Sequence, residues 1–394
     1  MELSRRAKDI SASVTLAITA KAKKLKSEGV DIVSFGAGEP DFNTPPNIID
    51  AAQKALDSGL TRYTPASGIG ELKAAICQKL KEDNNLSYKE DEIVVSNGAK
   101  HSLYNALFAI CNEGDEVIIP VPYWVSYPEL VKLVGAVPVY IETPEENEFK
   151  YKIEDLKKSI TSKTKAIILN SPNNPTGSVY SLEELQEIAA LAIENDIIVI
   201  SDEIYEKLVY EDVVHVSIAS LSDEIKDRTI VVNGVSKSYA MTGWRIGYTA
   251  CNSTIAKIMS NFQSHATSNP NSIAQYASVE AISGSQDEVN RMKGEFEKRR
   301  DFMVDKVNSI EGLSCRKPKG AFYVMINITG IKGRVINGVE IKTSVDFCDT
   351  LLDGAKVAAI PGAGFGSDDY IRLSYATSMD NIKEGLNRIE NFIK

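Results

Sequence analysis

The sequence is poor in histidine and in cysteine, and both shortages limit the chemistry open to it. It has three histidines, His101, His215 and His265, and five cysteines, none of them in a CxxC pair. Isolated histidines cannot supply a His-rich metal site, and scattered cysteines in odd number are typical of reduced, mostly buried thiols. We therefore expect no metal site and a cytoplasmic location.

The chain also lacks a long apolar run and an excess of basic residues. No stretch approaches the roughly 18 apolar residues of a membrane-spanning helix, and the N-terminus has no apolar segment of the signal-peptide kind. Lys and Arg number 44 against 54 Asp and Glu, which gives a formal net charge of −10. This charge argues against nucleic acid or an anionic membrane as the main partner, but it allows local basic pockets for small anions.

What the chain does have is an alternation of apolar runs and amphipathic helical segments. The runs are short and continuous, which predicts strands buried on both faces of a sheet. They lie within 91–96, 115–124, 136–143, 164–170, 197–205 and 229–237. Between two of them, 181–196 is typical of an amphipathic helix with Ser181 as its N-cap. Strands separated by helices predict a mostly parallel α/β sheet.

The character of the sequence changes after about residue 285. A long charged helical stretch at 285–310 precedes several apolar segments and a final amphipathic helix. We therefore predict an α/β fold with a large domain at 47–285, whose mostly parallel sheet is flanked by helices, and a smaller α+β domain at 286–394. Residues 1–46 are expected to form an N-terminal arm and part of the small domain.

Polar or aromatic side chains follow four of the predicted strands. Trp124, Asn174, Asp202 and Lys237 each come directly or shortly after an apolar run. Taken singly, each is more often a structural or solvated residue than a functional one. Because ligands bind at the carboxyl ends of strands in such sheets, the joint occurrence predicts one shared site.

Lys237 is the residue with the most distinctive chemistry. Burial and the nearby cation Arg245 would disfavour its ammonium form, and a neutral amine forms Schiff bases with carbonyls. A carboxylate such as Asp202 would keep a heterocyclic nitrogen protonated. Gly98 and Ala99, between a strand and a helix, would offer backbone N–H groups to a phosphate. A lysine Schiff base with an acidic partner for a pyridinium is the arrangement expected for pyridoxal phosphate.

Six segments carry a family resemblance: "SKSYAMTGWRIGY", "NSPNNPTG", "SDEIYEKLVY", "GAGEPDF", "PYWVSYPE" and "IRLSYAT". Together they resemble the class I aminotransferases, which are fold-type I pyridoxal phosphate enzymes, and they look closest to the bacterial aspartate aminotransferase branch. The resemblance runs from about Ser13 to the C-terminus. It implies the fold predicted above.

The resemblance implies roles for residues around the cofactor. Lys237 resembles the lysine that forms the Schiff base and later moves the substrate's α-proton, and Asp202 matches the acid paired with the pyridine nitrogen. Tyr205 and Asn174 match groups that hydrogen-bond the phenolic oxygen of the cofactor, and Trp124 matches the aromatic residue that stacks on the ring. The phosphate would be held by Gly98, Ala99, Lys100 and Arg245. Tyr63 resembles the tyrosine that reaches the phosphate of a neighbouring subunit, which implies a homodimer.

The resemblance also implies how a substrate is held. Arg372 matches the arginine that grips the substrate α-carboxylate, and Gly38 matches a backbone position lining the pocket beside Trp124 and Asn174. Lys100 either contacts a distal carboxylate or faces the phosphate, and both readings stay open. The hydroxyls of Ser13 and Thr15 are candidate helpers for a distal carboxylate.

The implied activity is a ping-pong amino transfer. The expected donor is L-aspartate and the expected acceptor 2-oxoglutarate, which would give oxaloacetate and L-glutamate. Two alternatives stay open. The first is another donor of the same family, such as an aromatic amino acid, alanine or prephenate, and the second is a pyridoxal-phosphate-dependent C–S lyase.

Overall fold

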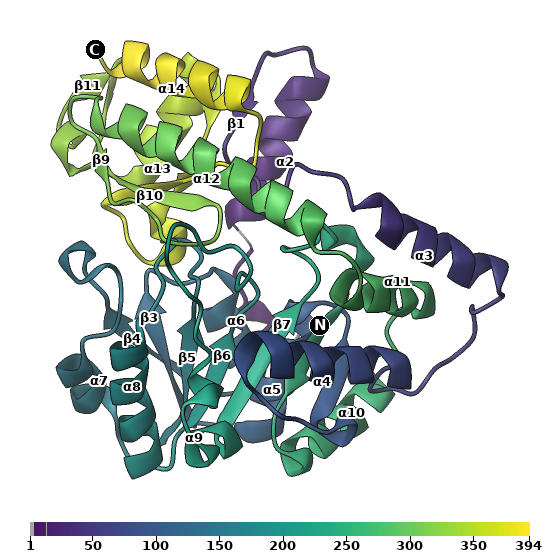
Figure 1. Ribbon diagram of the computed structural model, residues 1–394. Coiled ribbons are helices and arrows are strands. Elements are labelled where there is room, and N and C mark those ends of the chain that lie inside the picture. Colours follow the sequence, from purple (N-terminus) through teal and green to yellow (C-terminus); the bar gives the residue numbers. More distant parts are fainter. Residues whose placement is uncertain (1–3, 13) are drawn as a thin grey trace.

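The protein is built around a mixed sheet of seven strands (Figure 1). The computed structural model describes residues 4–12 and 14–394. In sheet order the strands are β2 (Ile93–Ser96), β8 (Gly247–Ala250), β7 (Thr229–Gly234), β6 (Ile198–Asp202), β5 (Thr164–Asn170), β3 (Glu116–Val121) and β4 (Val137–Glu142). The five strands from β7 to β4 are mutually parallel, and β8 runs antiparallel to both of its neighbours. The predicted α/β fold with a mostly parallel sheet is confirmed.

Helices cover both faces of this sheet. One face carries α5 (Ala99–Ile110), α6 (Ser126–Leu133) and α10 (Ser253–Ala266). The other carries α7 (Ile153–Ser159), α8 (Leu182–Glu194) and α9 (Asp223–Asp227) at one end, and α3 (Pro46–Asp57), α4 (Gly70–Asn84) and α11 (Ser272–Ser283) at the other. Successive side chains along a strand point to opposite faces of the sheet: those of Val117 and Ile119 pack with α5, whereas that of Ile118 packs with α8. This explains why the strands read as continuous apolar runs.

The predicted N-cap of α8 is confirmed. The hydroxyl of Ser181 accepts a hydrogen bond from the backbone N–H of Glu184, and the Glu184 carboxylate accepts one from the N–H of Ser181. Such a reciprocal pair stabilises a helix start by about 1 kcal/mol.

The C-terminal part of the chain forms a second, antiparallel sheet. Its strands lie in the order β14 (Ile360–Pro361), β15 (Tyr370–Ser374), β10 (Tyr323–Asn327) and β9 (Ser314–Cys315). Around it lie α12 (Asp287–Asn308), α13 (Ser344–Thr350) and α14 (Met379–Ile393), and a small hairpin of β11 (Val335–Ile336) and β12 (Val339–Glu340) projects nearby. The charged stretch at 285–310 is therefore a helix, as predicted.

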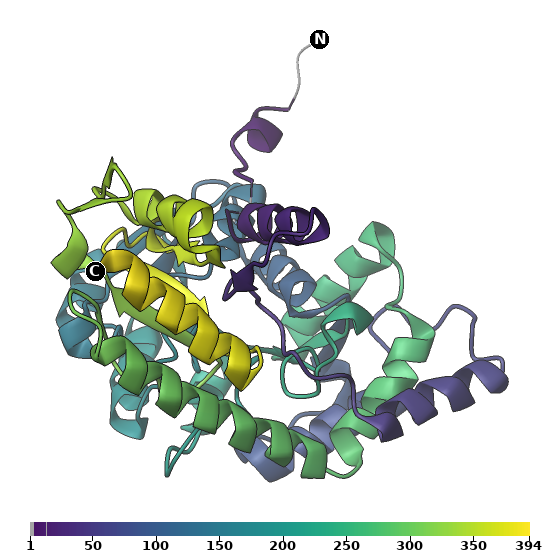
Figure 2. The same ribbon diagram turned by 90° about the horizontal axis from the view of Figure 1, so that it is seen from above.

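Residues from the start of the chain join this C-terminal part. After α1 (Arg5–Lys8) and α2 (Val14–Ser27), the short strand β1 (Val33–Ser34) pairs in parallel with β13 (Val357–Ala358). Figure 2 shows α2 beside the C-terminal elements. Val33 and Phe35 share one apolar core with residues of α12, β10, β15 and α14. The boundaries at residues 46 and 285 stay a prediction.

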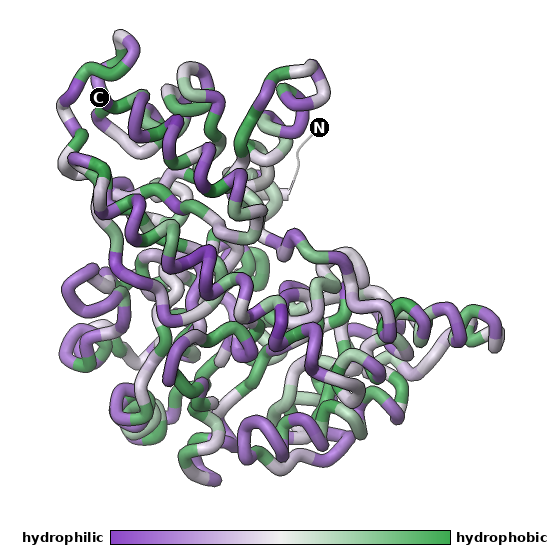
Figure 3. The backbone as a smooth tube through the Cα atoms, turned by 45° about the horizontal axis from the view of Figure 1, so that its top comes forward, coloured by the Kyte–Doolittle hydropathy of each residue, from purple (hydrophilic) through white to green (hydrophobic). Residues whose placement is uncertain are grey.

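The segment after β6 links the two sheets. Ile204, Tyr205 and Leu208 follow the last residue of that strand and pack into the C-terminal core together with Phe322 and Tyr323. Figure 3 shows hydrophilic and hydrophobic residues alternating along the helices that surround both sheets. In the described part of the chain no helix has both the length and the apolar character needed to cross a membrane.

Candidate active site

A cavity of about 700 Å³ lies where the parallel strands of the large sheet end. Trp124 after β3, Asn174 after β5, Asp202 at the end of β6 and Lys237 after β7 all line it. The C-terminal sheet closes the cavity from the other side with Arg372 of β15. The four strand ends singled out in the sequence therefore meet at one place, as parallel topology requires.

Most of the residues proposed from the sequence line this cavity. They are Gly38, Ala99, Lys100, Trp124, Asn174, Asp202, Tyr205, Lys237, Arg245 and Arg372. Gly98 lies behind the cavity wall as the N-cap of α5. Tyr63 lies in the loop between α3 and α4 with 92% of its surface exposed, away from the cavity of its own chain. Thr15 reaches the cavity from α2, whereas Ser13 falls outside the described residues.

Lys237 presents a buried amine to the cavity. Its Nζ donates a hydrogen bond to the carbonyl oxygen of Gly38 at 2.5 Å. Burial lowers the pKa of Lys237 to about 8, and the positive charges of Arg372 and Arg245 act in the same direction while Glu39 opposes them. The shift has the direction and the main cause expected from the sequence. Near neutral pH the amine is therefore much closer to its nucleophilic form than an exposed lysine is.

Asp202 is a buried carboxylate held in a fixed orientation. The hydroxyl of Tyr127 donates to its Oδ2 at 2.7 Å, and the N–H of Ile204 donates to Oδ1 at 3.3 Å. Burial raises the pKa of Asp202 to about 6, although these two hydrogen bonds favour the charged form. A cationic group placed against the carboxylate from the cavity would supply the charge that its surroundings lack.

Arg372 is buried without an acidic partner among the described residues. Its Nη1 donates to Oδ1 of Asn174 at 3.0 Å and its Nη2 to the carbonyl oxygen of Gly36 at 3.3 Å, while its Nε has no partner. The guanidinium lies 4.3 Å from the centre of the Tyr323 ring. Burial lowers the pKa of Arg372. Because an unpaired buried charge is costly, this arginine has the environment of a group that binds an anion.

The start of α5 offers a second place for an anion. No described side chain caps this helix, so its first backbone N–H groups are free to bind a ligand. Gly98 has a φ of 86°, and a Cβ there would collide with the guanidinium of Arg245. Arg245 is held in place by the carbonyl oxygens of Thr242 and Asn97, at 2.9 and 3.3 Å. Helix N–H groups and an adjacent guanidinium form a cradle suited to phosphate.

Two further residues complete the cavity wall near this cradle. The Nζ of Lys100 lies 4.9 Å from the centre of the Trp124 ring, and burial lowers the pKa of Lys100, with a further contribution from Arg245. On the opposite side the hydroxyls of Tyr205 and Tyr323 share a hydrogen bond of 3.0 Å. The cavity thus has an aromatic wall, a carboxylate, an amine and several cations around one space.

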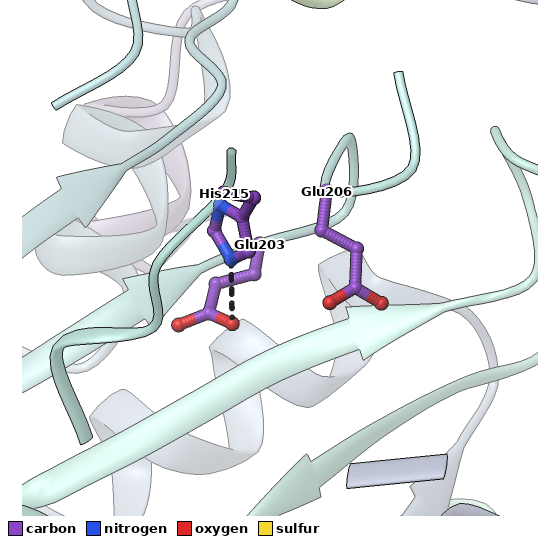
Figure 4. Close-up of side chains that lie close together, drawn as sticks. All are labelled: Glu203, Glu206 and His215. Carbon is purple, nitrogen blue, oxygen red and sulfur yellow. Dashed lines mark hydrogen bonds and ion pairs between the residues drawn. The ribbon is translucent and has the colours of Figure 1, made fainter. Parts of the chain in front are cut away.

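A second polar cluster lies outside the cavity (Figure 4). Glu203, Glu206 and His215 hold possible metal-ligand atoms within 4.8 Å of one another. Every carboxylate oxygen already has a partner: Ser201, Ser217 and His215 serve Glu203, and Lys79 and Asn84 serve Glu206. A metal ion would have to displace the Lys79 ammonium, so this cluster is an internal ion-pair network rather than a metal centre.

Sequence reasoning missed three residues that shape the site. Tyr127 holds Asp202, Tyr323 contacts both Tyr205 and Arg372, and Asn170 at the end of β5 donates to the backbone oxygen of Asp202 at 2.9 Å. The sequence offered one indication for Tyr127: it lies three residues after Trp124, close enough to reach the same site. Tyr323 could not be found that way because it comes from the C-terminal sheet.

Comparison with known proteins agrees with this geometry. The family described as aminotransferase class I and II matches residues 30–389. The chain is 52% identical to an aspartate aminotransferase of Bacillus sp. strain YM-2 over 392 residues, which cover 100% of this chain and 99% of that protein.

More distant matches extend the same pattern. A probable aspartate/prephenate aminotransferase of Aquifex aeolicus is 47% identical, covering 100% of this chain and 98% of that one. The crystal structure of the aspartate aminotransferase from Rhizobium meliloti superimposes with a TM-score of 0.96 at 43% identity, covering 100% and 99% of the two chains. These likenesses extend over the whole chain, and we conclude that it belongs to the class I and II aminotransferase family.

Proposed function

We propose that this protein transfers the amino group of L-aspartate to 2-oxoglutarate by a ping-pong reaction that uses pyridoxal phosphate. The observation that carries the proposal is a pair of basic groups at the cavity with no acidic partner in contact, the buried guanidinium of Arg372 and the amine of Lys237. The amine suits covalent attachment of an aldehyde, and the guanidinium suits a carboxylate. Relatives named as aspartate aminotransferases support the choice of donor.

The residues around the cavity fit pyridoxal phosphate. Lys237 would bind the aldehyde carbon, and Asp202 would pair with the pyridine nitrogen. Tyr205 and Asn174 would hydrogen-bond the phenolic oxygen, and Trp124 would lie on the ring. The phosphate would occupy the cradle formed by Gly98, Ala99, Arg245 and the backbone N–H of Lys100, whose side chain is left for the substrate. When bound, the cofactor supplies an electron sink for the bonds of the substrate α-carbon.

This fit rests on two observations about the chain itself. The first is the uncapped start of α5 beside Arg245, where a Cβ at Gly98 would collide with the guanidinium. The second is the carboxylate of Asp202, whose pKa burial raises to about 6 and which faces the cavity without a cationic partner in contact. An anionic phosphate and a pyridinium would satisfy both needs at once.

Each catalytic step assigned to the chain follows from these positions. Arg372 holds the substrate α-carboxylate through its guanidinium fork, which fixes the α-carbon near Lys237. The neutral Nζ of Lys237 would take the proton from the substrate α-carbon. The ammonium group formed in this way would donate that proton later in the same half-reaction. A pKa of about 8 allows the same nitrogen to act as base and then as acid near neutral pH.

Asp202 keeps its negative charge directed at the cavity throughout. The hydroxyl of Tyr127 donates to its Oδ2 and the N–H of Ile204 to its Oδ1, which fixes the carboxylate while each oxygen keeps a further lone pair for a cationic partner. Burial strengthens that pairing because the local dielectric is low. With the cofactor bound, the carboxylate would keep the pyridine nitrogen protonated, which the electron sink requires.

Selection of a dicarboxylate is assigned to Lys100 and Thr15. Both line the same cavity as Arg372, so a substrate held by Arg372 at its α-carboxylate could place a second carboxylate toward them. Lys100 lies beside Trp124 at an exposed position of the cavity wall, and its ammonium group can bind an anionic partner there. The name of the Aquifex aeolicus relative keeps prephenate, a 2-oxo acid, as an alternative amino acceptor.

The proposal includes an assembly and a location. Tyr63, with 92% of its surface exposed, is assigned to the phosphate site of a second copy, so the enzyme would be a homodimer with shared sites. The large unit at 47–285 would hold the cofactor, and residues 1–46 with 286–394 would form the smaller unit. A cytoplasmic location belongs to the same proposal, and the five cysteines are free thiols.

The test is a panel of half-reactions on the cofactor-loaded protein. Aspartate, glutamate, alanine and phenylalanine are added singly to the pyridoxal form, 2-oxoglutarate and prephenate to the pyridoxamine form, and the absorbance of the cofactor is followed. Fast conversion by aspartate and glutamate alone among the amino acids, and by 2-oxoglutarate among the oxo acids, supports the proposal. A preference for alanine or phenylalanine would discard the aspartate assignment, a preference for prephenate would discard 2-oxoglutarate as the acceptor, and release of pyruvate and sulfide from added cysteine without amino transfer would favour the lyase.

A further inference from the structure

The cavity extends well beyond the residues assigned to the cofactor. Its outer part is lined by α2 on one side and by Thr377 and Asn381, at the start of α14, on the other. In Figure 1 both helices stand at the same end of the molecule, above the edge of the large sheet. This outer part is the space that a substrate must pass on its way to Lys237.

One face of α2 forms a wall of this passage. Thr15, Thr19, Lys23 and Lys26 line the cavity, and their spacing of four, four and three residues places them on one side of the helix. The hydroxyl of Thr19 donates to the carbonyl oxygen of Thr15 at 2.8 Å, so it is turned along the helix. The stripe therefore runs from hydroxyls near the catalytic groups to two lysines at the outer end.

The lysines of α2 differ in whether their ammonium groups have ion-pair partners. Lys21 lies within ion-pair distance of Asp349 and Asp353, and Lys24 lies 3.9 Å from Glu28. By contrast, within residues 4–12 and 14–394 nothing forms an ion pair or a hydrogen bond with the ammonium group of Lys23 or Lys26. The two lysines that lack partners are the two that line the cavity.

Acidic groups at the cavity do not cancel this charge. Asp31 also lines the outer part, but its carboxylate is paired with Arg388. Glu39 and Asp202 also line the cavity; Asp202 is buried, and the hydroxyl of Thr242 donates to the exposed Glu39 at 2.7 Å. The cations that line the cavity are Lys23, Lys26, Lys100, Lys237, Arg245 and Arg372.

A positive passage matters because the protein as a whole is negative. Its formal net charge is −10, so its overall field repels an anion that approaches from solution. A local positive funnel with low-dielectric walls reverses that effect near its mouth and raises the encounter rate of anions. Exposed lysines act chiefly on association and lose their effect in salt, since the Debye length is about 10 Å at 0.1 M.

We propose that Lys23 and Lys26 form the charged mouth of an entry channel that guides dicarboxylates into the active site. The inference rests on the proposed function and adds a role for α2 in the capture of substrate. The two lysines act before the substrate reaches Arg372, so they set the rate of capture and leave the chemical step unchanged. The effect should follow substrate charge: strongest for 2-oxoglutarate, with two negative charges, weaker for aspartate, with one net charge, and weakest for alanine, with none.

The experiment compares two double variants of the same helix. Lys23→Gln with Lys26→Gln removes the channel charge, and Lys21→Gln with Lys24→Gln removes equal charge from the same helix away from the cavity. On the cofactor-loaded protein, we expect the first variant to lower the second-order rate constant for 2-oxoglutarate about three- to tenfold and to flatten its dependence on salt. The maximal half-reaction rate stays as in the unsubstituted protein, and the control stays within about twofold of it.

A second readout uses an unreactive dicarboxylate and no turnover. Association of maleate is followed by stopped-flow tryptophan fluorescence, to which Trp124 at the cavity contributes, and we expect the same loss of association rate in the Lys23 and Lys26 variant only. If both double variants behave alike with maleate and with 2-oxoglutarate, the channel is overturned while the aminotransferase assignment stands. If no amino acid reacts but maleate association still depends on Lys23 and Lys26, the proposed activity fails and the channel stands.

Discussion

Two groups of charged side chains, one that includes Asp202 and one that includes Glu206, have opposite surroundings although these two residues lie four positions apart. Asp202, Lys237 and Arg372 face the cavity, and none of them has an oppositely charged partner in direct contact among the described residues. Glu206 does not line the cavity. Its carboxylate forms an ion pair with Lys79 and accepts a hydrogen bond from Asn84. The shifts in pKa differ accordingly: burial raises that of Asp202 to about 6, whereas Lys79 and His215 outweigh burial and lower that of Glu206 to about 2.

This difference separates structural charge from functional charge. A buried pair that satisfies itself costs little once formed, but it loses several kcal/mol when one partner is removed. A buried charge without a partner destabilises the empty protein and gains its partner from a ligand. The comparison therefore predicts that substitutions in the two groups will have opposite consequences for stability and activity.

The largest effect on activity should come from Lys237→Ala. Loss of the amine removes both the attachment point and the proton carrier, so turnover should fall by about 10⁴-fold or more while the fold survives. Half-reaction rates and the circular dichroism of the variant measure the two outcomes. Activity near that of the unsubstituted protein would remove Lys237 from the mechanism.

The largest effect on stability should come from the paired group. Lys79→Met leaves the buried Glu206 carboxylate uncompensated, and we expect the free energy of unfolding to fall by about 3–5 kcal/mol. Lys81→Met, on an exposed position of the same helix, is the matched control and should change it by less than about 0.5 kcal/mol. Denaturant unfolding at neutral pH gives both values.

The unpaired group should respond in the opposite way. Arg372→Met removes a buried charge that no described carboxylate balances, so the cofactor-free protein should lose less than about 1 kcal/mol of stability or become more stable. The same change should lower kcat/KM for aspartate by about 10²-fold or more, because the α-carboxylate loses its partner. A loss of stability as large as that of Lys79→Met, with activity retained, would contradict the comparison.

The protonation of Asp202 gives a pH-dependent test. A carboxyl group whose pKa is raised in the folded state binds its proton more tightly when folded, so its contribution to stability falls as pH rises from its usual range of about 4 to about 6. Asp202→Asn should remove this fall and make the cofactor-free protein about 1–3 kcal/mol more stable at neutral pH. It should also weaken pyridoxal phosphate binding and slow α-proton removal. Identical pH profiles of stability in the two proteins would show that Asp202 is not shifted.

The smallest effect should come from Tyr127→Phe. The lost hydrogen bond favoured the charged form of Asp202, so the pKa of that carboxyl should rise further, and the acid limb of pyridoxal phosphate binding should move to higher pH. Tyr123→Phe, whose hydroxyl does not contact Asp202, is the control. If both variants bind the cofactor with the same pH dependence, Tyr127 does not position the carboxylate.

The fold and the inner part of the site could be predicted because their signals are local. Apolar runs marked the strands of the large sheet, and parallel topology then required Trp124, Asn174, Asp202 and Lys237 to meet at one edge. Ser181 was recognised as a cap because it directly precedes an amphipathic helical segment, and the structure adds the reciprocal hydrogen bond with Glu184.

The rest depends on contacts between distant parts of the chain. The pairing of β1 with β13 joins residues more than three hundred positions apart, and it brings α2 to the cavity mouth. Tyr323 reaches Tyr205 across 118 positions, with no spacing rule to indicate it. Tyr127 lies near Trp124 in sequence, but an aromatic residue at the start of an apolar helix has the pattern of a core residue.

The most direct test of the account is to locate the lysine that binds the cofactor. The protein is loaded with pyridoxal phosphate, the covalent bond is fixed with borohydride, and the modified peptide is identified by mass spectrometry. We predict a single adduct on Lys237, lost in Lys237→Ala. An adduct on Lys100 instead, or none after loading, would contradict the assignment of the cavity amine and the mechanism built on it.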